Sequence, residues 1–486
     1  MKSISSIAAN MSNDARKSLA LSTLSNTRTA SDLAEREGVS RKFLYQQKRI
    51  AEEAIDEAFA GKDNDVLFYL PVTRAWLDQL MIALILICHS SYGGVKELLR
   101  DLFNTSVSIG TIHNRVQEAA GQAAVINREQ NLSAIRVGLL DEIFQGTMPV
   151  LASIDAASTF CHILEGVEHR DAETWAIYLR DAKAQGFNPA YTIADAGTGL
   201  RAGHKLALGD TPCHGDVFHI QQQCETLSNV LTRVAKGTVT RRKALEIKMD
   251  AAGDTNSERS AQMAIALQSE QQAVQLARDV KTLMQWLGHD ILALAGPDLA
   301  QRRILFDWVV AELLQREQLD SHRIRPVRVA LENQRDDVLA FAGVLDEKFA
   351  VIAQSCKVSI DLVRDACLLQ RKSPLSTSYW QRWNQLHNKL AGKFQRVVNA
   401  VISAMKSTPR ASSLVENLNS RLRNYFFLRK QLHTPYLGLL QFFLNHRTFL
   451  RSNLPERVGK SPKQLMTGQS HPHWLELLGF TLFKRA

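Results

Sequence analysis

Three acidic residues, Asp141, Asp195 and Glu416, stand in settings suited to binding divalent metal ions. Asp141 follows a largely apolar stretch, residues 136–140, where an unpaired charge would be costly to bury. Asp195 ends a short apolar segment and precedes two glycines, which allow a backbone or a metal to approach closely. Metal-dependent phosphodiester cleavage needs carboxylates that converge from separate elements on two Mg²⁺ ions about 4 Å apart. We therefore predict that these acids hold two Mg²⁺ or Mn²⁺ ions.

Glu416 is one of only three acids between residue 372 and the C-terminus, and the other two fit a metal site less well. Glu456 lies beside a proline, and Glu476 lies among leucines. At about 100° per residue, a helix over 412–426 separates an apolar side from a polar one. The apolar side would hold Leu414, Leu418, Leu422 and Tyr425, and the polar side Glu416, Asn419, Ser420 and Arg423.

Each carboxylate also has a plainer interpretation. Asp195 could cap the helix that follows it, and Glu416 could be an ordinary surface residue. Asp141 competes with Asp155, another aspartate at a strand end, and with its neighbour Glu142, which strand alternation places on the opposite face. Because Asp155 would lie on the second strand, away from the sheet centre, Asp141 is the favoured first ligand.

The elements that must position these acids follow from apolar runs and turn residues. They predict strands over 135–144, 148–155 and 159–165, a helix over 171–185, a strand over 190–195, a helix near 200–208, a strand near 213–217 and a helix from about 219. This order indicates an α/β core of the ribonuclease H-like class with a mixed five-stranded sheet.

The rest of the chain reads as helical, and its length predicts about three domains. Long apolar periodicity without strand patterns predicts an all-α insertion, with 371–378 as the linker back to the core. We expect a helix-turn-helix region at 1–60, a second helix-turn-helix-like region at 61–130, the first part of the core at 134–224, the insertion and linker at 225–410, and core completion with a basic tail at 411–486.

Residues 29–45 have the pattern of two helices packed across a tight turn. Gly38 would end the first helix and Ser40 would cap the second. The second helix would present residue types that contact phosphates and base edges in DNA, namely Arg41, Lys42, Tyr45, Gln46, Lys48 and Arg49. A plain helical hairpin is the alternative.

A weaker version of this pattern spans residues 95–116, with Ser108 as the cap. Its second helix offers Thr111, His113, Asn114 and Arg115. These residues suit DNA contact, with Arg115 as the cationic candidate, and equally suit packing.

Charge is distributed unevenly along the chain. The net charge is +10, but residues 372–486 hold 18 basic residues against three acids, so this part carries +15 and the preceding part −5. A basic third suggests a polyanion partner, most commonly a phosphate backbone, although a solvated basic surface is the alternative.

Other compositional signals favour a cytoplasmic protein without a membrane partner. The apolar run at 77–88 is much shorter than the roughly 20 residues of a spanning helix, and the N-terminus shows no secretion signal. Six cysteines form no CxxC pair, which argues against a zinc ribbon and against a disulfide framework.

Four segments together resemble the DDE transposases of bacterial insertion sequences, especially those with a helical insertion before the final Glu. They are Leu140-Asp-Glu-Ile-Phe144, Ile193-Ala-Asp-Ala-Gly197, Asp216-Val-Phe-His219 and Val415-Glu-Asn-Leu-Asn-Ser-Arg-Leu-Arg423. The match covers most of residues 134–450, and the Glu416 segment is its most specific part. Asp216 and His219 match a C/D-x-x-H motif, which makes them supporting residues near the site and not primary metal ligands.

The resemblance implies a transposase that binds terminal inverted repeats, cleaves them with metal-activated water and joins the freed 3′-hydroxyl to target DNA. It implies that Asp141, Asp195 and Glu416 hold the metals. Arg421, Arg423, Arg429 and Lys430 would contact DNA phosphates. Because two ends must be processed, it also implies a homodimer or larger assembly, in a bacterial cytoplasm at the nucleoid.

Two other functions remain open. One is a helix-turn-helix DNA-binding regulator, inactive or domesticated, and the presence of all three acids argues against it. The other is a ribonuclease H-like nuclease without strand transfer, which the insertion and the two DNA-reading segments disfavour.

Overall fold

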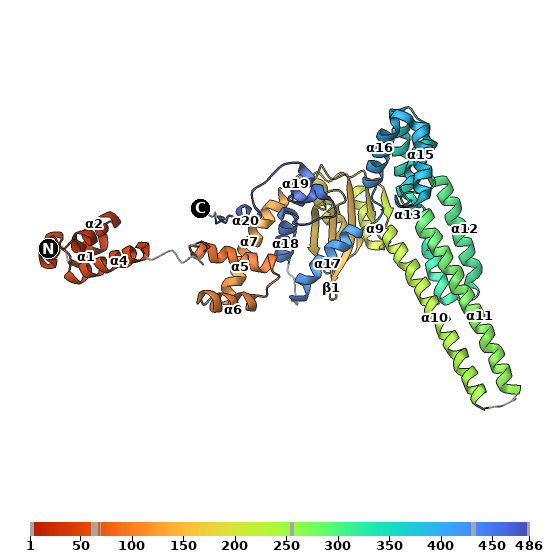
Figure 1. The fold of residues 1–486 in the computed structure, drawn as a ribbon, viewed down its shortest axis with the longest axis horizontal. Coiled ribbons are helices and arrows are strands. Elements are labelled where there is room, and N and C mark those ends of the chain that lie inside the picture. The colour runs from red at the N-terminus through yellow and green to blue at the C-terminus, as the bar shows by residue number, and fades with distance from the viewer. Residues whose placement is uncertain (1–3, 60–66, 69, 253–256, 429–433, 484–486) are drawn as a thin grey trace. The chain divides into compact units, whose positions relative to one another are not determined.

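The computed structural model describes residues 4–59, 67–68, 70–252, 257–428 and 434–483 (Figure 1). The chain forms two compact units, one within Met1–Val72 together with Phe483–Ala486 and the other comprising Thr73–Leu482. In the described part of the chain, no helix is both long and apolar enough to cross a membrane.

The N-terminal unit is helical, with α1 (Ile4–Asn10), α2 (Asn13–Leu24), α3 (Ala30–Glu37) and α4 (Arg41–Phe59). Gly38 ends α3 with a φ of +64°, and the Ser40 hydroxyl accepts the backbone N–H of Phe43 at the start of α4. Leu33 and Leu44 are buried against α2. The predicted helix pair with its glycine turn and serine cap is therefore confirmed.

A five-stranded mixed sheet forms the centre of the second unit, in the order β3-β2-β1-β4-β5. Strands β1, β2 and β3 are antiparallel, whereas β4 runs parallel to both β1 and β5. The strands are β1 (Val137–Gln145), β2 (Met148–Asp155), β3 (Cys161–Gly166), β4 (Tyr191–Ala194) and β5 (Cys213–Gly215), and the helices after β3, β4 and β5 are α8 (Ala172–Ala184), α9 (Thr198–Leu208) and α10 (Val217–Ala252). The predicted order of strands and helices and the mixed α/β core are confirmed.

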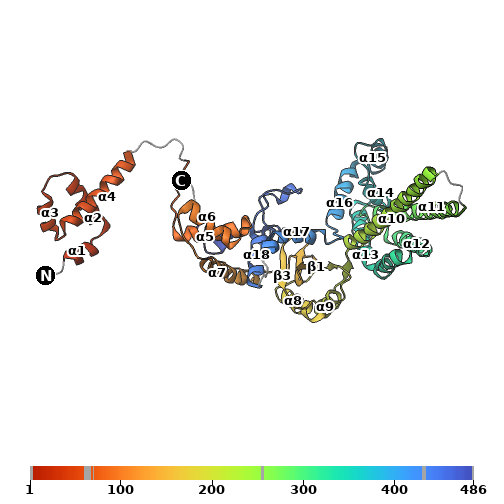
Figure 2. The same ribbon diagram turned by 90° about the horizontal axis from the view of Figure 1, so that it is seen from below.

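The two faces of the sheet carry different helices (Figure 2). Leu139 and Ile143 of β1 pack with α17 (Ser413–Leu428) and α18 (Thr434–His446). Leu140 packs with α8 and α9 on the other face. Because side chains alternate along a strand, Asp141 lies on the face of Leu139 and Ile143, which α17 covers.

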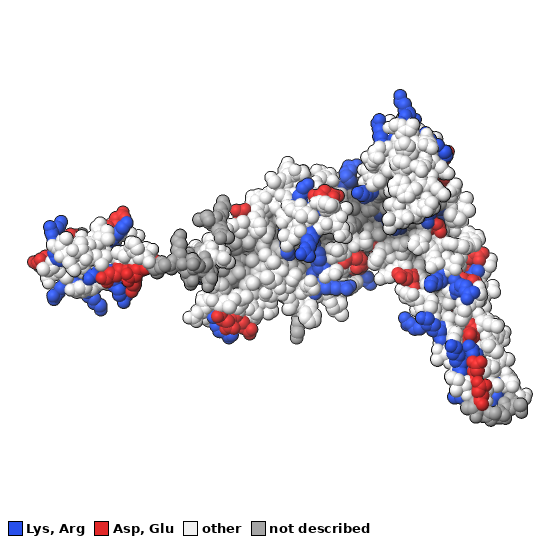
Figure 3. All heavy atoms as spheres, in the orientation of Figure 1, with Lys and Arg blue, Asp and Glu red and all other residues white. Residues whose placement is uncertain are grey.

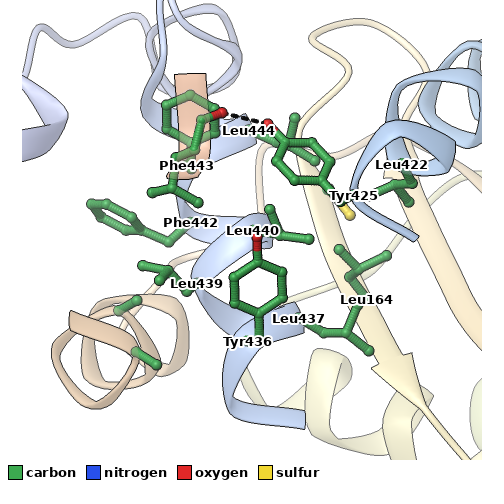
Figure 4. Close-up of a cluster of buried hydrophobic side chains, with 14 of the residues drawn as sticks. Leu164, Leu422, Tyr425, Tyr436, Leu437, Leu439, Leu440, Phe442, Phe443 and Leu444 are labelled. Carbon is green, nitrogen blue, oxygen red and sulfur yellow. Dashed lines mark hydrogen bonds between the residues drawn. The ribbon is translucent and has the colours of Figure 1, made fainter. Parts of the chain in front are cut away.

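The core beneath α17 extends into α18 and the helices before the sheet (Figure 4). Leu422 and Tyr425 of α17 lie among the buried side chains of α18, and the Tyr425 hydroxyl donates to the carbonyl of Leu86 at 2.6 Å. Burial of this apolar side fixes the rotation of α17 and therefore the direction of Glu416.

Three helices that precede the sheet belong to the same core: α5 (Arg74–Ile87), α6 (Tyr92–Phe103) and α7 (Ile109–Arg128). The Ser108 hydroxyl caps α7 by accepting the backbone N–H of Thr111 at 3.0 Å. One side of α7, including Ile112 and Val116, is buried, and α7 contacts α18. The second helix pair thus forms as predicted, and it packs as part of the unit that contains the sheet.

In the described residues between α10 and α17 the insertion is helical, as predicted. Its helices are α11 (Ser257–Trp286), η1 (Leu287–Ile291), α12 (Leu299–Glu317), α13 (Ser321–Cys356), α14 (Ile360–Leu369), α15 (Thr377–Leu390), η2 (Ala391–Lys393) and α16 (Phe394–Lys406). One apolar core joins α10 to α13, and a second joins α13 to α16. Both groups of helices are visible in Figure 1.

The prediction that residues 371–378 form the linker from the insertion back to the core is wrong. Pro374 lies in the turn between α14 and α15, and α15 and α16 bury Leu386, Leu390 and Val397 in the same core as α14. The chain returns to the sheet through 407–412, after which come α17, α18, η3 (Pro455–Arg457), α19 (Pro462–Thr467) and α20 (Trp474–Leu477).

Candidate metal centre

Asp141, His219 and Glu416 form a group in which one ligand atom of each residue lies within 4.8 Å of the others. Asp141 comes from β1, His219 from the first turn of α10 and Glu416 from the first turn of α17. The whole helical insertion separates His219 from Glu416 in sequence, so tertiary contacts bring them together. The group unites two of the predicted ligands with a residue predicted to be supporting.

Asp141 is almost completely buried, at 4% exposure. Its Oδ1 accepts the backbone N–H of Glu142 at 2.8 Å, and its Oδ2 has no hydrogen-bond partner among the described residues. Burial raises the pKa of Asp141 to about 7; the Glu142 N–H and His219 oppose the shift, whereas Asp195 and Glu416 add to it. A bound cation would offset the burial of this charge.

His219 has a buried Nε2 without a hydrogen bond among the described residues. Its nearest acidic atom is Oδ2 of Asp216, at 3.5 Å, which is an ion-pair distance but too long for a hydrogen bond. A neutral imidazole with a free nitrogen is a metal ligand. The position of His219 therefore suits direct ligation as well as support.

Asp216 connects the two helices that carry His219 and Glu416. It is buried and accepts the backbone N–H of Phe218 at 2.8 Å and that of Ser412 at 3.2 Å. The Ser412 hydroxyl also donates to Asp216, and the Ser412 carbonyl accepts the N–H of Glu416 at 3.2 Å. We call Asp216 and Ser412 the helix latch, because they join the beginning of α10 to the beginning of α17.

Asp195 follows β4, the parallel neighbour of β1, as predicted, but it is not one of the three mutually close ligand residues. Its Oδ1 accepts the backbone N–H of Gly197 at 3.0 Å. Asp195 is near enough to raise the pKa of Asp141. It therefore lies beside the group, where it could hold a second ion.

Arg201 holds the backbone around Asp195, a role that the sequence analysis did not predict. Its guanidinium donates to the carbonyls of Ala194 and Asp195 at the end of β4 and to those of Cys213 and His214 in β5. The sequence feature that could have indicated this role is that Arg201 is the one arginine of α9, the short helix that follows the candidate ligand Asp195. By joining both strand ends, Arg201 fixes the position of Asp195.

The glycines after Asp195 serve packing. A Cβ at Gly199 would lie 2.2 Å from the carbonyl oxygen of Arg170, and a Cβ at Gly203 would lie 2.5 Å from the Cβ of Trp175. These contacts bring α9 against α8. The predicted close approach therefore occurs at Gly199, where the approaching group is the backbone of Arg170.

The competing acids are engaged elsewhere. Asp155 accepts the backbone N–H and the hydroxyl of Ser158, at 2.8 and 2.5 Å, within its own turn. Glu142, on the opposite face as predicted, accepts from Arg170 at 2.9 Å and from the Trp175 indole at 3.0 Å. Neither residue joins the ligand group.

On α17, the predicted apolar side is observed, with Leu418, Leu422 and Tyr425 buried and Leu414 half-buried. Glu416 is half-buried, and Ser420 and Arg423 are exposed. Asn419 differs from the expected polar side, because it is buried and its Oδ1 has no partner among the described residues.

The predicted DNA-contacting residues lie in several settings. On α4, Lys48 is half-buried and pairs with Glu52, and Arg49 pairs with Glu53; the exposed residues are Arg41, Lys42, Tyr45, Gln46 and Arg49. Arg115 forms ion pairs with Asp78 at 3.3 Å and with Glu118 at 2.6 Å.

On and after α17, Arg423 is exposed and Arg421 is half-buried, whereas Arg429 and Lys430 lie outside the described residues. Figure 3 shows basic side chains around α17 and α16.

The ligand group fits a divalent cation. Carboxylates are ligands that Mg²⁺ and Mn²⁺ prefer, whereas an imidazole nitrogen is a more common ligand of transition metals than of Mg²⁺. Two buried atoms, Oδ2 of Asp141 and Nε2 of His219, have no hydrogen-bond partner within the described ranges, and a cation could interact with both. All six cysteines are free thiols, and none belongs to the group.

Comparison with known proteins adds no relative: no protein-family model matches the chain, and no curated protein is significantly similar to it.

Proposed function

We propose that this protein is a DNA transposase with a ribonuclease H-like core that carries out metal-dependent phosphodiester hydrolysis and strand transfer. The observation that carries the proposal is the convergence of Asp141, His219 and Glu416 across a helical insertion, with Asp195 beside them. A set of acids that converges from separate elements is what two-metal phosphoryl transfer requires.

The topology supports this proposal. An antiparallel three-stranded meander followed by two parallel strands places β1 at the sheet centre, with β4 next to it. Asp141 and Asp195 therefore come from neighbouring strands, and α17 brings Glu416 to the same face. This is the arrangement that the resemblance to insertion-bearing DDE transposases implies.

Each residue has a distinct role in this proposal. Asp141, Glu416 and His219 would hold one Mg²⁺ or Mn²⁺ ion, and Asp195 would share a second with Asp141. Bound ions there supply Lewis-acid chemistry, which activates a water or a 3′-hydroxyl and neutralises charge on the phosphate. The helix latch positions His219 and Glu416, and Arg423 would contact a DNA phosphate.

The remaining parts fit the recognition of DNA. Helix α4 presents Arg41, Lys42, Tyr45, Gln46 and Arg49 on its exposed side, as a helix in a major groove requires. These residues would read terminal inverted repeats. Processing of two ends calls for a homodimer or larger assembly in the bacterial cytoplasm, at the nucleoid.

The test uses the full chain with Mg²⁺ or Mn²⁺ and a DNA fragment that carries the inverted repeats flanking the gene. We expect cleavage at the repeat ends and joining of the 3′-ends to a plasmid target, both absent from Asp195→Asn. Glu456→Gln, which changes an exposed acid outside the ligand group, is the matched control and should cleave normally.

Two outcomes would overturn the proposal. Binding without cleavage under every metal condition would identify a DNA-binding regulator. Cleavage without joining to target DNA would identify a nuclease.

A further inference from the structure

A cavity lies beside α17, and Glu416 is not among the residues that line it. Its volume is about 630 Å³, within the range of roughly 300–1,000 Å³ that small-molecule sites occupy. It is lined by Asn417 and Arg421 of α17 and by residues of the segment after α18. At about 100° per residue, Glu416 and Arg421 point about 140° apart, so they lie on opposite flanks of the buried stripe of α17.

Three arginines, Arg421, Arg451 and Arg457, line this cavity, and none of the described residues around it is acidic. Arg457 donates to the carbonyl of Ala157 at 2.6 Å, and Arg451 is exposed. The cavity therefore offers positive charge without an internal counter-ion.

Other buried or partly buried arginines of the described chain have hydrogen-bond or ion-pair partners. Arg302 and Arg410 donate to backbone carbonyls. Arg242, Arg316 and Arg328 each pair with two carboxylates. Arg421 forms no ion pair with any described carboxylate. Burial lowers its pKa, and the positive charge of Arg447 lowers it further. Because burying an unpaired charge is costly, this arrangement points to an external anion.

The other cavity walls are apolar or carry neutral polar groups. Leu414, Leu418 and Phe449 provide apolar surface, and Asn417, Ser452 and Asn453 provide hydrogen-bonding groups. A ligand that matches this lining has an anionic part, an apolar flat part and polar edges. A nucleoside phosphate has all three, since bases stack on aromatic and arginine side chains and phosphates pair with arginine.

We propose that this cavity binds one nucleoside phosphate, with its phosphate at Arg421 and its base against Leu414, Leu418 and Phe449. The proposal rests on the proposed function in one respect, namely that the natural source is an unstacked nucleotide of the bound DNA strand. Free nucleotides have the same chemistry, so the experiment must separate the two sources. A duplex cannot enter a cavity of this size without releasing a base from its stack.

The experiment measures binding in EDTA, where metal-dependent cleavage is suppressed. Full-length protein is titrated with a single-stranded oligonucleotide that contains 2-aminopurine, and fluorescence reports the environment of the base. The same titration is made with free 2-aminopurine deoxynucleoside monophosphate and with inorganic phosphate as a competitor. We expect a fluorescence change that saturates with the oligonucleotide.

The key variant is Arg421→Met, which keeps an apolar chain of similar length and removes the unpaired charge. It should weaken binding roughly ten- to hundredfold, as loss of a charge-assisted hydrogen bond predicts. Arg382→Met, an exposed charge on α15, is the matched control and should bind as wild type does. Thermal unfolding of both variants verifies that they fold.

Unchanged oligonucleotide binding by folded Arg421→Met would overturn the proposal. Competition by phosphate without any base-dependent fluorescence would also overturn it, because the cavity would then bind only an anion. Tight binding of the free monophosphate identifies a free nucleotide as the source, and binding of the oligonucleotide alone identifies a DNA strand.

The cavity and the metal centre can fail independently. Asp141→Asn should keep the fluorescence change while losing cleavage. If wild type never cleaves DNA but the Arg421-dependent change persists, the proposed function fails and the nucleotide site stands. If wild type cleaves and joins DNA while Arg421→Met binds normally, only the nucleotide site fails.

Discussion

The two flanks of α17 carry charged groups of opposite sign. Acidic residues gather on the flank of Glu416, and arginines gather on the flank of Arg421. On one flank, Glu416 lies with Asp141 and His219, whose Oδ2 and Nε2 have no hydrogen-bond partner among the described residues; there we propose a cation. On the other flank, Arg421 lines a cavity with two further arginines, where we propose that an anion binds. A single helix of 16 residues, held by its apolar stripe, can thus serve two sites of opposite charge.

This difference teaches how stability and binding are connected in the protein. Groups that are buried without partners cost folding free energy, and a ligand that supplies the missing partner offsets that cost. Metal ions should therefore stabilise the acidic flank, and a nucleoside phosphate should stabilise the basic flank.

The largest expected effect comes from removing a carboxylate of the acidic flank, the side of α17 where Glu416 lies with Asp141 and His219. Asp141→Asn should reduce DNA cleavage about 10³-fold, which corresponds to several kcal/mol of lost charge stabilisation. The measurement is the single-turnover cleavage rate with saturating Mn²⁺, with Glu456→Gln as the control. A rate within tenfold of wild type would remove Asp141 from the site.

The second effect concerns pH. The pKa of Asp141 is raised by burial to about 7 in the folded chain, from 3.8. The stabilising contribution of its protonated form is complete below about pH 4 and is lost as pH rises through about 7. Metal-free protein should thus lose on the order of a few kcal/mol of stability over this range.

Urea unfolding at several pH values measures this loss. In Asp141→Asn the decline should be smaller by the contribution of this one carboxyl. Saturating Mn²⁺ should also reduce the decline in wild type. Identical pH profiles for wild type and Asp141→Asn would contradict the assigned burial of the charge.

The third effect decides between ligation and support by His219. His219→Ala should weaken Mn²⁺ binding in either role, since loss of an outer-shell partner alone lowers metal affinity roughly ten- to hundredfold. The decisive measurement is therefore spectroscopic. The spin-echo spectrum of bound Mn²⁺ should contain a nitrogen coupling that the variant lacks. His322→Ala, an exposed histidine in the insertion, is the control. Wild-type spectra without nitrogen coupling would return His219 to a supporting role.

The fourth effect concerns the helix latch. Ser412→Ala removes the hydroxyl that donates to the buried Asp216 carboxylate and should cost about 1–3 kcal/mol of unfolding free energy. Ser413→Ala, at the exposed neighbouring position, should cost much less. Chemical denaturation measures both. Equal effects of the two substitutions would show that the latch contributes nothing.

The smallest expected effect is on the free energy of unfolding when Arg421, on the basic flank of α17, is replaced. Arg421→Met should raise the unfolding free energy by about 1 kcal/mol without DNA, because it removes a buried charge that has no counter-ion. Destabilisation would mean that Arg421 has an intramolecular role. The same measurement with bound oligonucleotide should reverse the sign, since only wild type gains the ligand.

Local patterns in the sequence were sufficient for the elements of the core. An apolar run and turn residues located β2 at 148–155, Gly38 and Ser40 located the turn between α3 and α4, and the apolar spacing of α17 predicted the side on which Glu416 lies. These features depend on residues within a few positions of one another, so the sequence alone determines them.

Only the tertiary structure decided which ligand atoms meet. His219 joins Asp141 and Glu416, Asp195 lies beside them, and Arg421 lines a separate cavity. The exit from the insertion also lay beyond local signals, because Pro374 marks a turn within the insertion. The physical reason is that His219 and Glu416 are separated by the insertion. Packing of α13 and α17 against the sheet and of α10 against α13 sets the distances between these residues.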